Sequence, residues 1–194
     1  MSKVVVLTNL TLDGVMQSPA GPGEDPRDGF EHGGWAAPYA AMEATGNNFA
    51  SAGALLFGRR TYENFYAVWP RRTNSPYTQF LNTIPKYVAS TTLQEPLPWS
   101  NSTLLQGDAA QAVSQLKEQP GKDLLIMGSG ELVQSLMRAN LVDEYVLLIH
   151  PLILGSGRRL FPNGGAFAAL RLVGTRTTNN GIVIVTYQPA EPTM

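Results

Sequence analysis

Short apolar runs rich in β-branched residues alternate along the chain with segments that have helical spacing of their apolar residues. The clearest apolar runs cover residues 4–10, 54–57, 86–90, 123–127 and 144–149. Near-continuous apolar character is typical of strands that are covered on both faces, as in parallel sheets. The alternation therefore predicts an α/β fold with a substantially parallel sheet.

Helix and turn signals complete this picture in the second half of the chain. Asp108, followed three residues later by Gln111, resembles a capping box at the start of a helix. Residues 132–137 carry one apolar face of a second helix. Alternating residues on either side of an Asn-Asn-Gly turn predict a terminal hairpin over residues 171–188. A further helix is expected over residues 38–47.

Two segments are expected to be irregular. Residues 18–34 contain five glycines and three prolines, which favours a long loop over a packed element. Residues 69–76, which begin with Trp-Pro and end with a second proline, are expected to form another loop. Long loops often carry binding or catalytic groups, so residues 18–34 are a candidate lid.

Composition narrows the classes of function. A chain of 194 residues with 43% hydrophobic content fits one domain, residues 1–194. A formal net charge of -1 gives no broad attraction for nucleic acid or for an anionic membrane. The absence of cysteine excludes disulfides, thiolate metal ligands and cysteine nucleophiles. No run approaches the roughly 20 apolar residues of a membrane span, so a cytoplasmic protein is expected.

Two strand-to-helix turns could bind phosphate. Residues 127–131 place a Gly-Ser-Gly turn directly before a helix, where free backbone N–H groups and the helix dipole favour anions. Residues 57–62 repeat the arrangement and add Arg59 and Arg60, whose guanidinium groups suit phosphate oxygens. Each turn alone also fits an ordinary connection, and adjacent arginines often only solvate a helix end. Metal binding is not expected, because the two histidines, His32 and His150, lack a second ligand at helical spacing.

The order of several short motifs resembles the dihydrofolate reductase-like superfamily over nearly the whole chain. It is most similar to stand-alone proteins related to the reductase domain of bifunctional riboflavin-biosynthesis enzymes. The resemblance implies a three-layer α/β/α sandwich on a mixed, mostly parallel sheet, with NADPH across the carboxyl ends of the central strands. The motifs are Leu12-Asp13-Gly14, the run from Phe57 to Glu63, Lys86-Tyr87-Val88-Ala89-Ser90, Met127-Gly128-Ser129-Gly130, and the run from His150 to Gly157 ahead of Leu160-Phe161.

The same resemblance assigns cofactor residues. The first strand and the turn after it would border the nicotinamide, and the two glycine turns would hold phosphates. Preference for NADPH over NADH would depend on Arg59 and Arg60, because the basic residue that many relatives carry near Thr91 is absent. The residues are Thr8, Asn9, Gly14, Val15, Gly58, Arg59, Arg60, Thr61, Ser90, Thr91, Gly128, Ser129, Gly130, Glu131 and Leu132.

Candidates on the substrate side have plainer alternatives. Glu43 lies in the stretch where dihydrofolate reductases supply an acid, but most glutamates are solvated helix residues. Asp13 could bond the substrate or simply cap the turn after the first strand. Trp35, Phe30 and Tyr39 could form an aromatic wall for a flat heterocycle, although aromatic clusters more often belong to a core.

The sequence therefore predicts an NADPH-dependent reductase that transfers hydride to a small heterocycle of the pterin or dihydrofolate kind. One alternative is reduction of the phosphoribosylamino-uracil of riboflavin biosynthesis, although this chain lacks an Arg in residues 84–87 and an acid near Ser90 that such reductases carry. Another is a non-catalytic protein that binds a nucleotide or a drug. The resemblance also implies a homodimer, with an interface on residues 145–161.

Overall fold

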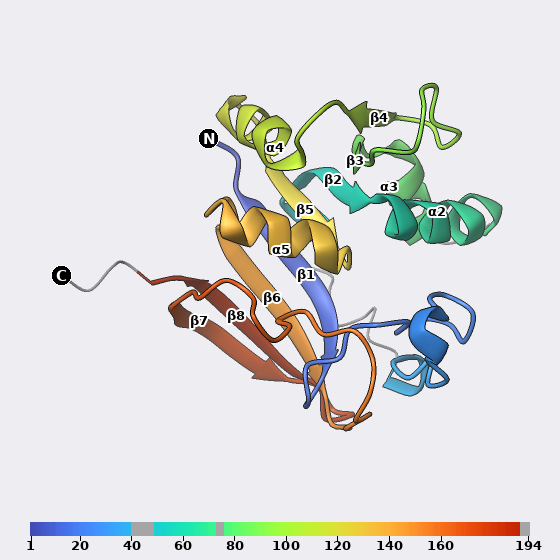
Figure 1. The fold of residues 1–194 in the computed structure, drawn as a ribbon, viewed down its shortest axis with the longest axis vertical. Helices are drawn as coiled ribbons and strands as arrows, with labels where there is room; N and C mark the ends of the chain where they lie inside the picture. The colour runs from blue at the N-terminus through green and yellow to red at the C-terminus, as the bar shows by residue number, and fades with distance from the viewer. Residues whose placement is uncertain (40–48, 73–75, 191–194) are drawn as a thin grey trace.

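One eight-stranded sheet runs through the molecule (Figure 1). The computed structural model describes residues 1–39, 49–72 and 76–190. The strands lie in the order β4-β3-β2-β5-β1-β6-β8-β7; the pairs from β4 to β6 are parallel, and β8 pairs antiparallel with both β6 and β7. Their bounds are β1 Val4–Thr11, β2 Ala52–Gly58, β3 Lys86–Ala89, β4 Ser102–Leu105, β5 Asp123–Met127, β6 Glu144–His150, β7 Leu170–Thr177 and β8 Val183–Pro189.

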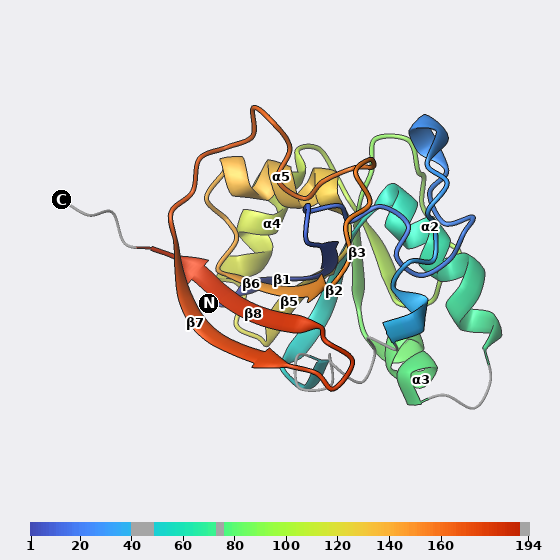
Figure 2. The same cartoon turned by 90° about the horizontal axis from the view of Figure 1, so that it is seen from below.

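Helices cover both faces of this sheet, so the expected three-layer arrangement is confirmed (Figure 2). One layer contains α2 and α3, and the other contains α4 and α5. Short 3-10 helices η1, η2 and η4 lie in the connections. The bounds are α2 Arg59–Val68, α3 Pro76–Thr83, α4 Ala109–Glu118, α5 Gly130–Arg138, η1 Arg27–Gly29, η2 Ala37–Tyr39 and η4 Trp69–Arg71.

The first strand shows how the sequence separates the two cores. Successive side chains of a strand point to opposite faces of the sheet. Val4 and Val6 therefore pack with the residues under α4 and α5, while Val5 and Leu7 pack with those under α2 and α3. All four are buried, which explains the apolar run of this strand.

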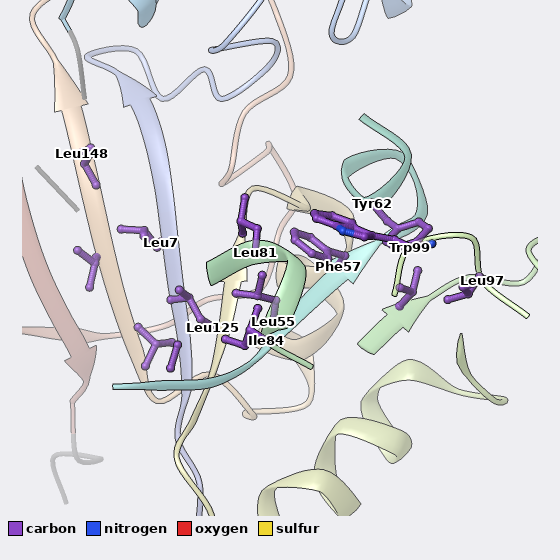
Figure 3. Packing of buried hydrophobic residues seen from close by; sticks show 14 of the residues in the cluster. Leu7, Leu55, Phe57, Tyr62, Leu81, Ile84, Leu97, Trp99, Leu125 and Leu148 are labelled. Carbon is purple, nitrogen blue, oxygen red and sulfur yellow. The ribbon is translucent and has the colours of Figure 1, made fainter. Parts of the chain in front are cut away.

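An aromatic group fixes α2 against the sheet (Figure 3). The ring of Phe57, at the end of β2, lies 6.4 Å from that of Trp99, and Tyr62 of α2 lies 6.1 Å from Trp99. The Tyr62 hydroxyl accepts a hydrogen bond of 3.0 Å from the Trp99 backbone N–H. This packing fixes the start of α2, which carries Arg59 and Arg60, at the end of β2.

Most predicted elements are confirmed. The strands, the terminal hairpin and the two late helices are present, and Asp108 caps α4 by accepting a hydrogen bond of 2.9 Å from the Gln111 N–H. The prediction of a plain loop over residues 69–76 is wrong at its end, because α3 begins at Pro76, and β4 was not predicted at all. Most of the helix expected over residues 38–47 lies outside the described residues.

The placement of β6 contradicts one part of the expected dimer interface, the strand itself. This strand lies between β1 and β8 and is hydrogen-bonded to both, and Tyr145, Val146, Leu147 and Leu148 are buried within the chain. They are not free to contact a second copy. The homodimer stays a prediction. The buried β6 side chains cannot form its interface, whereas residues 150–161, which include the exposed Ile153 and Phe161, stay part of the prediction.

Within residues 1–39, 49–72 and 76–190, we find no helix with the length and apolar character that crossing a membrane requires.

Candidate functional site

The two predicted glycine turns meet at one edge of the sheet. Parallel strands end on the same side, so the turns after β2 and β5 lie next to each other. The Gly58 N–H donates a hydrogen bond of 3.0 Å to Ser129 Oγ, and a side chain added at Gly128 would lie 3.6 Å from Thr61 Cγ2. The starts of α2 and α5 therefore converge on one place.

The turn before α5 leaves backbone donors available. Gly128 and Ser129 both have left-handed backbones, with φ values of 66° and 55°. Ser129 precedes the first helical residue, yet its side chain does not cap the helix, because its hydroxyl binds Gly58 instead. The first N–H groups of a helix have no partner within the helix. Those of Gly130 to Leu132 form a ready site for an anion.

A cavity of about 470 Å³, which we call the sheet-end pocket, opens in front of β1, β5 and β6. Its floor contains Leu7, Thr8 and Asn9, and loop residues 16–27 and 157–163 contribute to its walls. Apolar groups from the strands together with a few polar groups are typical of a site for a small organic ligand.

A second cavity of about 490 Å³, the helix-end pocket, adjoins the first. It is lined by the start of α2, the residues after β3, including Ser90 and Thr91, and the first turn of α5. Both pockets share Arg27, Arg60 and Glu131 among their walls. Two adjoining cavities at helix N-termini could accept a ligand with two parts that are joined by an anionic group.

All of the predicted cofactor residues line one or both pockets, except Gly14 and Val15. Gly14 forms a tight turn with its N–H bonded to Thr11 O, and Val15 is fully buried. Neither residue lines either pocket, so their role at the nicotinamide stays a prediction. Met16 and Gln17, which follow them, line the sheet-end pocket instead.

Asp13 has a structural role. Its carboxylate accepts hydrogen bonds from Thr11 Oγ1 and from the Leu154 and Gly155 N–H groups, at 2.5, 3.2 and 2.9 Å, and lies 3.6 Å from Arg159. Burial acts against its charged form, but these bonds outweigh it and lower the pKa of Asp13. The Asp13 carboxylate is held ionised and lies outside both pockets. The catalytic assignment of Asp13 is therefore corrected, and its role is to stabilise the turn after β1.

The expected aromatic wall is a small core of the loop. Phe30 and Trp35 are each only 8% exposed, and they pack with Val15. The Trp35 indole N–H donates a hydrogen bond of 2.7 Å to Gln17 O. Tyr39 is half-buried, and none of the three predicted aromatic residues lines either pocket. Phe30 and Trp35 are therefore core residues of the loop, and the substrate-binding role expected for Tyr39 stays a prediction.

His150 connects this loop core to the pocket floor. Its ring is fully buried, with the Trp35 and Tyr39 rings edge-on at centroid distances of 5.1 Å. Burial lowers the pKa of His150 to about 4, so the ring is neutral near pH 7. His150 Nε2 lies 2.9 Å from Asn9 Oδ1, and the amide oxygen is the acceptor in this bond. A buried histidine thus orients an amide of the sheet-end pocket.

Sequence reasoning missed an acid in this pocket. Glu24 lies in the loop of residues 18–34, lines the sheet-end pocket and accepts a hydrogen bond of 2.8 Å from the Ala20 N–H. Burial raises the pKa of Glu24, with a further contribution from the nearby charge of Asp25. Nothing in the local sequence separates it from other loop glutamates. Glu43, the predicted proton donor, lies outside the described residues.

In the part of the chain that the structure describes, no group of three or more His, Asp or Glu side chains could hold a metal ion.

The sequence model of the family described as RibD C-terminal domain matches residues 2–184. The chain belongs to this family. The RibD C-terminal family is reductase-like, which places the chain among the oxidoreductases. Two Bacillus subtilis (strain 168) relatives are the uncharacterized proteins YyaP, 30% identical over 137 residues, and YwjB, 27% identical over 143 residues. These matches cover 69% and 70% of this chain and 72% and 76% of the relatives.

Solved structures share the fold of this RibD C-terminal family member. A putative riboflavin biosynthesis protein from Shewanella sp. PV-4 aligns with a TM-score of 0.69 at 19% identity, over 97% of this chain and 99% of that chain. A pyrimidine reductase-like protein from Corynebacterium diphtheriae aligns with a TM-score of 0.65 at 12% identity, over 98% and 92%. These similarities confirm the dihydrofolate reductase-like fold.

Proposed function

We propose that this chain is an NADPH-dependent reductase that transfers hydride to a small heterocycle, with a pyrimidine as the favoured substrate. The observation that carries the proposal is the hydrogen bond between Gly58 and Ser129, which joins two phosphate-type turns where two pockets meet. The pyrimidine is favoured over a pterin because the structural neighbours are described as riboflavin biosynthesis and pyrimidine reductase-like proteins.

The residues present fit a dinucleotide. Arg59, Ser90 and Thr91 line only the helix-end pocket and would hold the adenosine side with its 2'-phosphate. The free N–H groups at the start of α5 would hold the pyrophosphate. Thr8 and Asn9 would face the nicotinamide and the substrate in the sheet-end pocket. Bound NADPH would supply the hydride.

The chain itself contributes alignment, exclusion of water and one proton. Leu7, Met127 and Leu148 give the sheet-end pocket apolar walls that keep water out. Asn9, oriented by its bond to His150, would position a polar edge of the heterocycle. Glu24 is our candidate proton donor, since its raised pKa keeps more of the carboxyl protonated at a given pH.

Binding and turnover separate the proposal from its alternatives. NADPH and NADH are titrated by nicotinamide fluorescence, and NADPH oxidation is then followed with dihydrofolate and with the riboflavin-pathway pyrimidine. Oxidation with the pyrimidine is the expected result, and oxidation with dihydrofolate alone would favour the pterin. Binding without oxidation of NADPH by either compound would favour a non-catalytic nucleotide-binding protein. Failure to bind either dinucleotide would overturn the reductase assignment.

Replacement of Arg59 by alanine should weaken the binding of NADPH about tenfold and leave the binding of NADH nearly unchanged, because only NADPH has the 2'-phosphate. The Arg59 guanidinium is available for this role, since its pair with Glu63 at 3.3 Å is exposed and weak. Arg60→Ala is the matched comparison. The resemblance shared the NADPH preference between the two arginines, but Arg60 lines both pockets. We therefore place Arg60 beside the phosphates that both dinucleotides have, and its loss should weaken the binding of both similarly. Equal losses of NADPH and NADH in Arg59→Ala would refute the assignment.

Replacement of Glu24 by glutamine should lower kcat at least about tenfold and leave the NADPH dissociation constant unchanged, because the amide fills the same space but has no acidic proton to transfer. Steady-state rates are measured across pH with the substrate that oxidises NADPH. Wild-type activity should fall as Glu24 loses its proton, and this limb should be absent from the variant. Glu31→Gln, an exposed acid of the same loop, is the control. An unchanged kcat in Glu24→Gln would exclude Glu24 as the donor.

A further inference from the structure

Three arginines from different parts of the fold converge on one oxygen of Glu131. Arg27, Arg158 and Arg60 lie 3.2, 3.6 and 3.8 Å from Glu131 Oε1. Arg27 belongs to the long loop after β1, Arg158 to the loop after β6, and Arg60 to the first turn of α2. Neither Arg27 nor Arg158 belongs to the two glycine turns that the phosphate prediction used.

This cluster lies where the two pockets meet. Arg27, Arg60 and Glu131 line both pockets, and Arg158 lines the sheet-end pocket. Glu131 is also in the first turn of α5, where the helix dipole favours negative charge. A phosphate group that lies between the two pockets would therefore meet the same helix end and the same guanidinium groups as the Glu131 carboxylate.

Among the acids of the cluster, Glu131 is the one that can exchange most easily. Asp25 and Asp28 hold Arg27 and Arg158 at 2.5 and 2.9 Å and keep these side chains in place. Glu131 makes only longer contacts, shares a single oxygen among them, and its side chain is 72% exposed. Exposed pairs of this kind contribute little to stability, because water and salt screen them, so the Glu131 carboxylate can be displaced easily.

We propose that Glu131 is an internal competitor for a phosphate site formed by Arg27, Arg60, Arg158 and the start of α5. A phosphate has more oxygens and more charge than a carboxylate, so each guanidinium can bind an oxygen of its own. Phosphate binding would displace the Glu131 side chain and connect the loop of residues 18–34 to the loop after β6. The source of that phosphate, cofactor or substrate, rests on the proposed function.

Glu131→Gln tests the site with inorganic pyrophosphate as the probe. The variant removes the competing charge and leaves three arginines beside the helix end, so pyrophosphate should bind about tenfold more tightly, as measured by titration calorimetry at low ionic strength. Arg158→Ala should weaken the binding of pyrophosphate about tenfold. Glu118→Gln, at the exposed end of α4, makes the same change in net charge away from both pockets and is the control.

Two results would overturn the site. Pyrophosphate could bind Glu131→Gln no more tightly than Glu118→Gln, or Arg158→Ala could bind it as well as the wild type does. Competition with NADPH then identifies the source. Displacement of pyrophosphate by NADPH supports the cofactor phosphates, whereas simultaneous binding supports a substrate phosphate and contradicts the placement of the cofactor pyrophosphate at the start of α5. If the Glu131→Gln effect appears in a protein that binds no dinucleotide, the phosphate site stands and the reductase proposal falls.

Discussion

Acidification from about pH 7 to about pH 4 should reduce the free energy of unfolding by about 3 kcal/mol through His150 alone. Burial lowers the pKa of this imidazole to about 4, because a charge here would lie between the Trp35 and Tyr39 rings. Its Nδ1 atom is buried without a hydrogen-bond partner among the described residues, so a second ring proton would gain no acceptor.

Stability falls on acidification because the unfolded state binds a proton more readily than the folded state does. In the unfolded chain the histidine pKa is about 6.5, so between this value and about 4 the unfolded state binds a proton that the folded state rejects. The contribution of the neutral ring to stability is fully present above the unfolded pKa and is lost as the pH falls toward the folded pKa. Urea unfolding at a series of pH values measures the effect.

The variant His150→Gln keeps an amide donor for Asn9 and removes the titrating group. Between about pH 7 and about pH 4, its free energy of unfolding should fall by about 3 kcal/mol less than that of the wild type. His32→Gln is the matched control, because solvent reaches the His32 ring before and after unfolding. Parallel pH curves for the wild type and His150→Gln would show that the imidazole is not held neutral.

The strands could be predicted because buried strands consist of apolar residues, which the sequence shows directly. A strand with helices on both faces has apolar residues at every position, as in Val4 to Leu7, and such a run is visible without any tertiary information. Helix α3 was not predicted although apolar residues recur at 77, 80, 81 and 84. Pro76 was assigned to the end of the loop over residues 69–76, whereas it is the first residue of the helix, a position that suits proline. The four-residue strand β4 is too short to show a period.

The site was predictable where it depends on local turns and unpredictable where it depends on distant partners. The Gly-Ser-Gly and Gly-Arg-Arg turns are local features, and both lie at the expected edge of the sheet. The contact between Arg27 and Glu131 joins residues 104 positions apart, and no spacing rule reports it.

The long loop shows the same limit. Its aromatic residues suggested a ligand wall, but Phe30 and Trp35 instead form the loop's own small core with Val15. Periodicity detects faces of regular elements, whereas the inside of an irregular loop has no period to detect.

Raising the pH from about 7 to about 10 should increase the free energy of unfolding by about 2 kcal/mol through Lys86. This lysine is fully buried at the start of β3. Its ammonium donates a hydrogen bond of 2.7 Å to Ile84 O and lies 4.7 Å from the centroid of the Trp99 ring. Burial lowers the pKa of Lys86 to about 8, so the folded protein releases a proton that the unfolded chain keeps up to about 10.5.

The variant Lys86→Met, of similar length and without charge, should lose this rise, whereas Lys3→Met, at an exposed lysine, should keep it. The comparison must end near pH 10, because burial raises the pKa of Tyr145 to about 12 and its ionisation then opposes folding. Because Trp99 also contacts Tyr62 at the start of α2, the charge that this experiment measures lies beneath the helix that presents Arg59 and Arg60. If the free energy of unfolding rises with pH no more steeply in the wild type than in Lys86→Met, the buried ammonium is stabilised as well as it is in water.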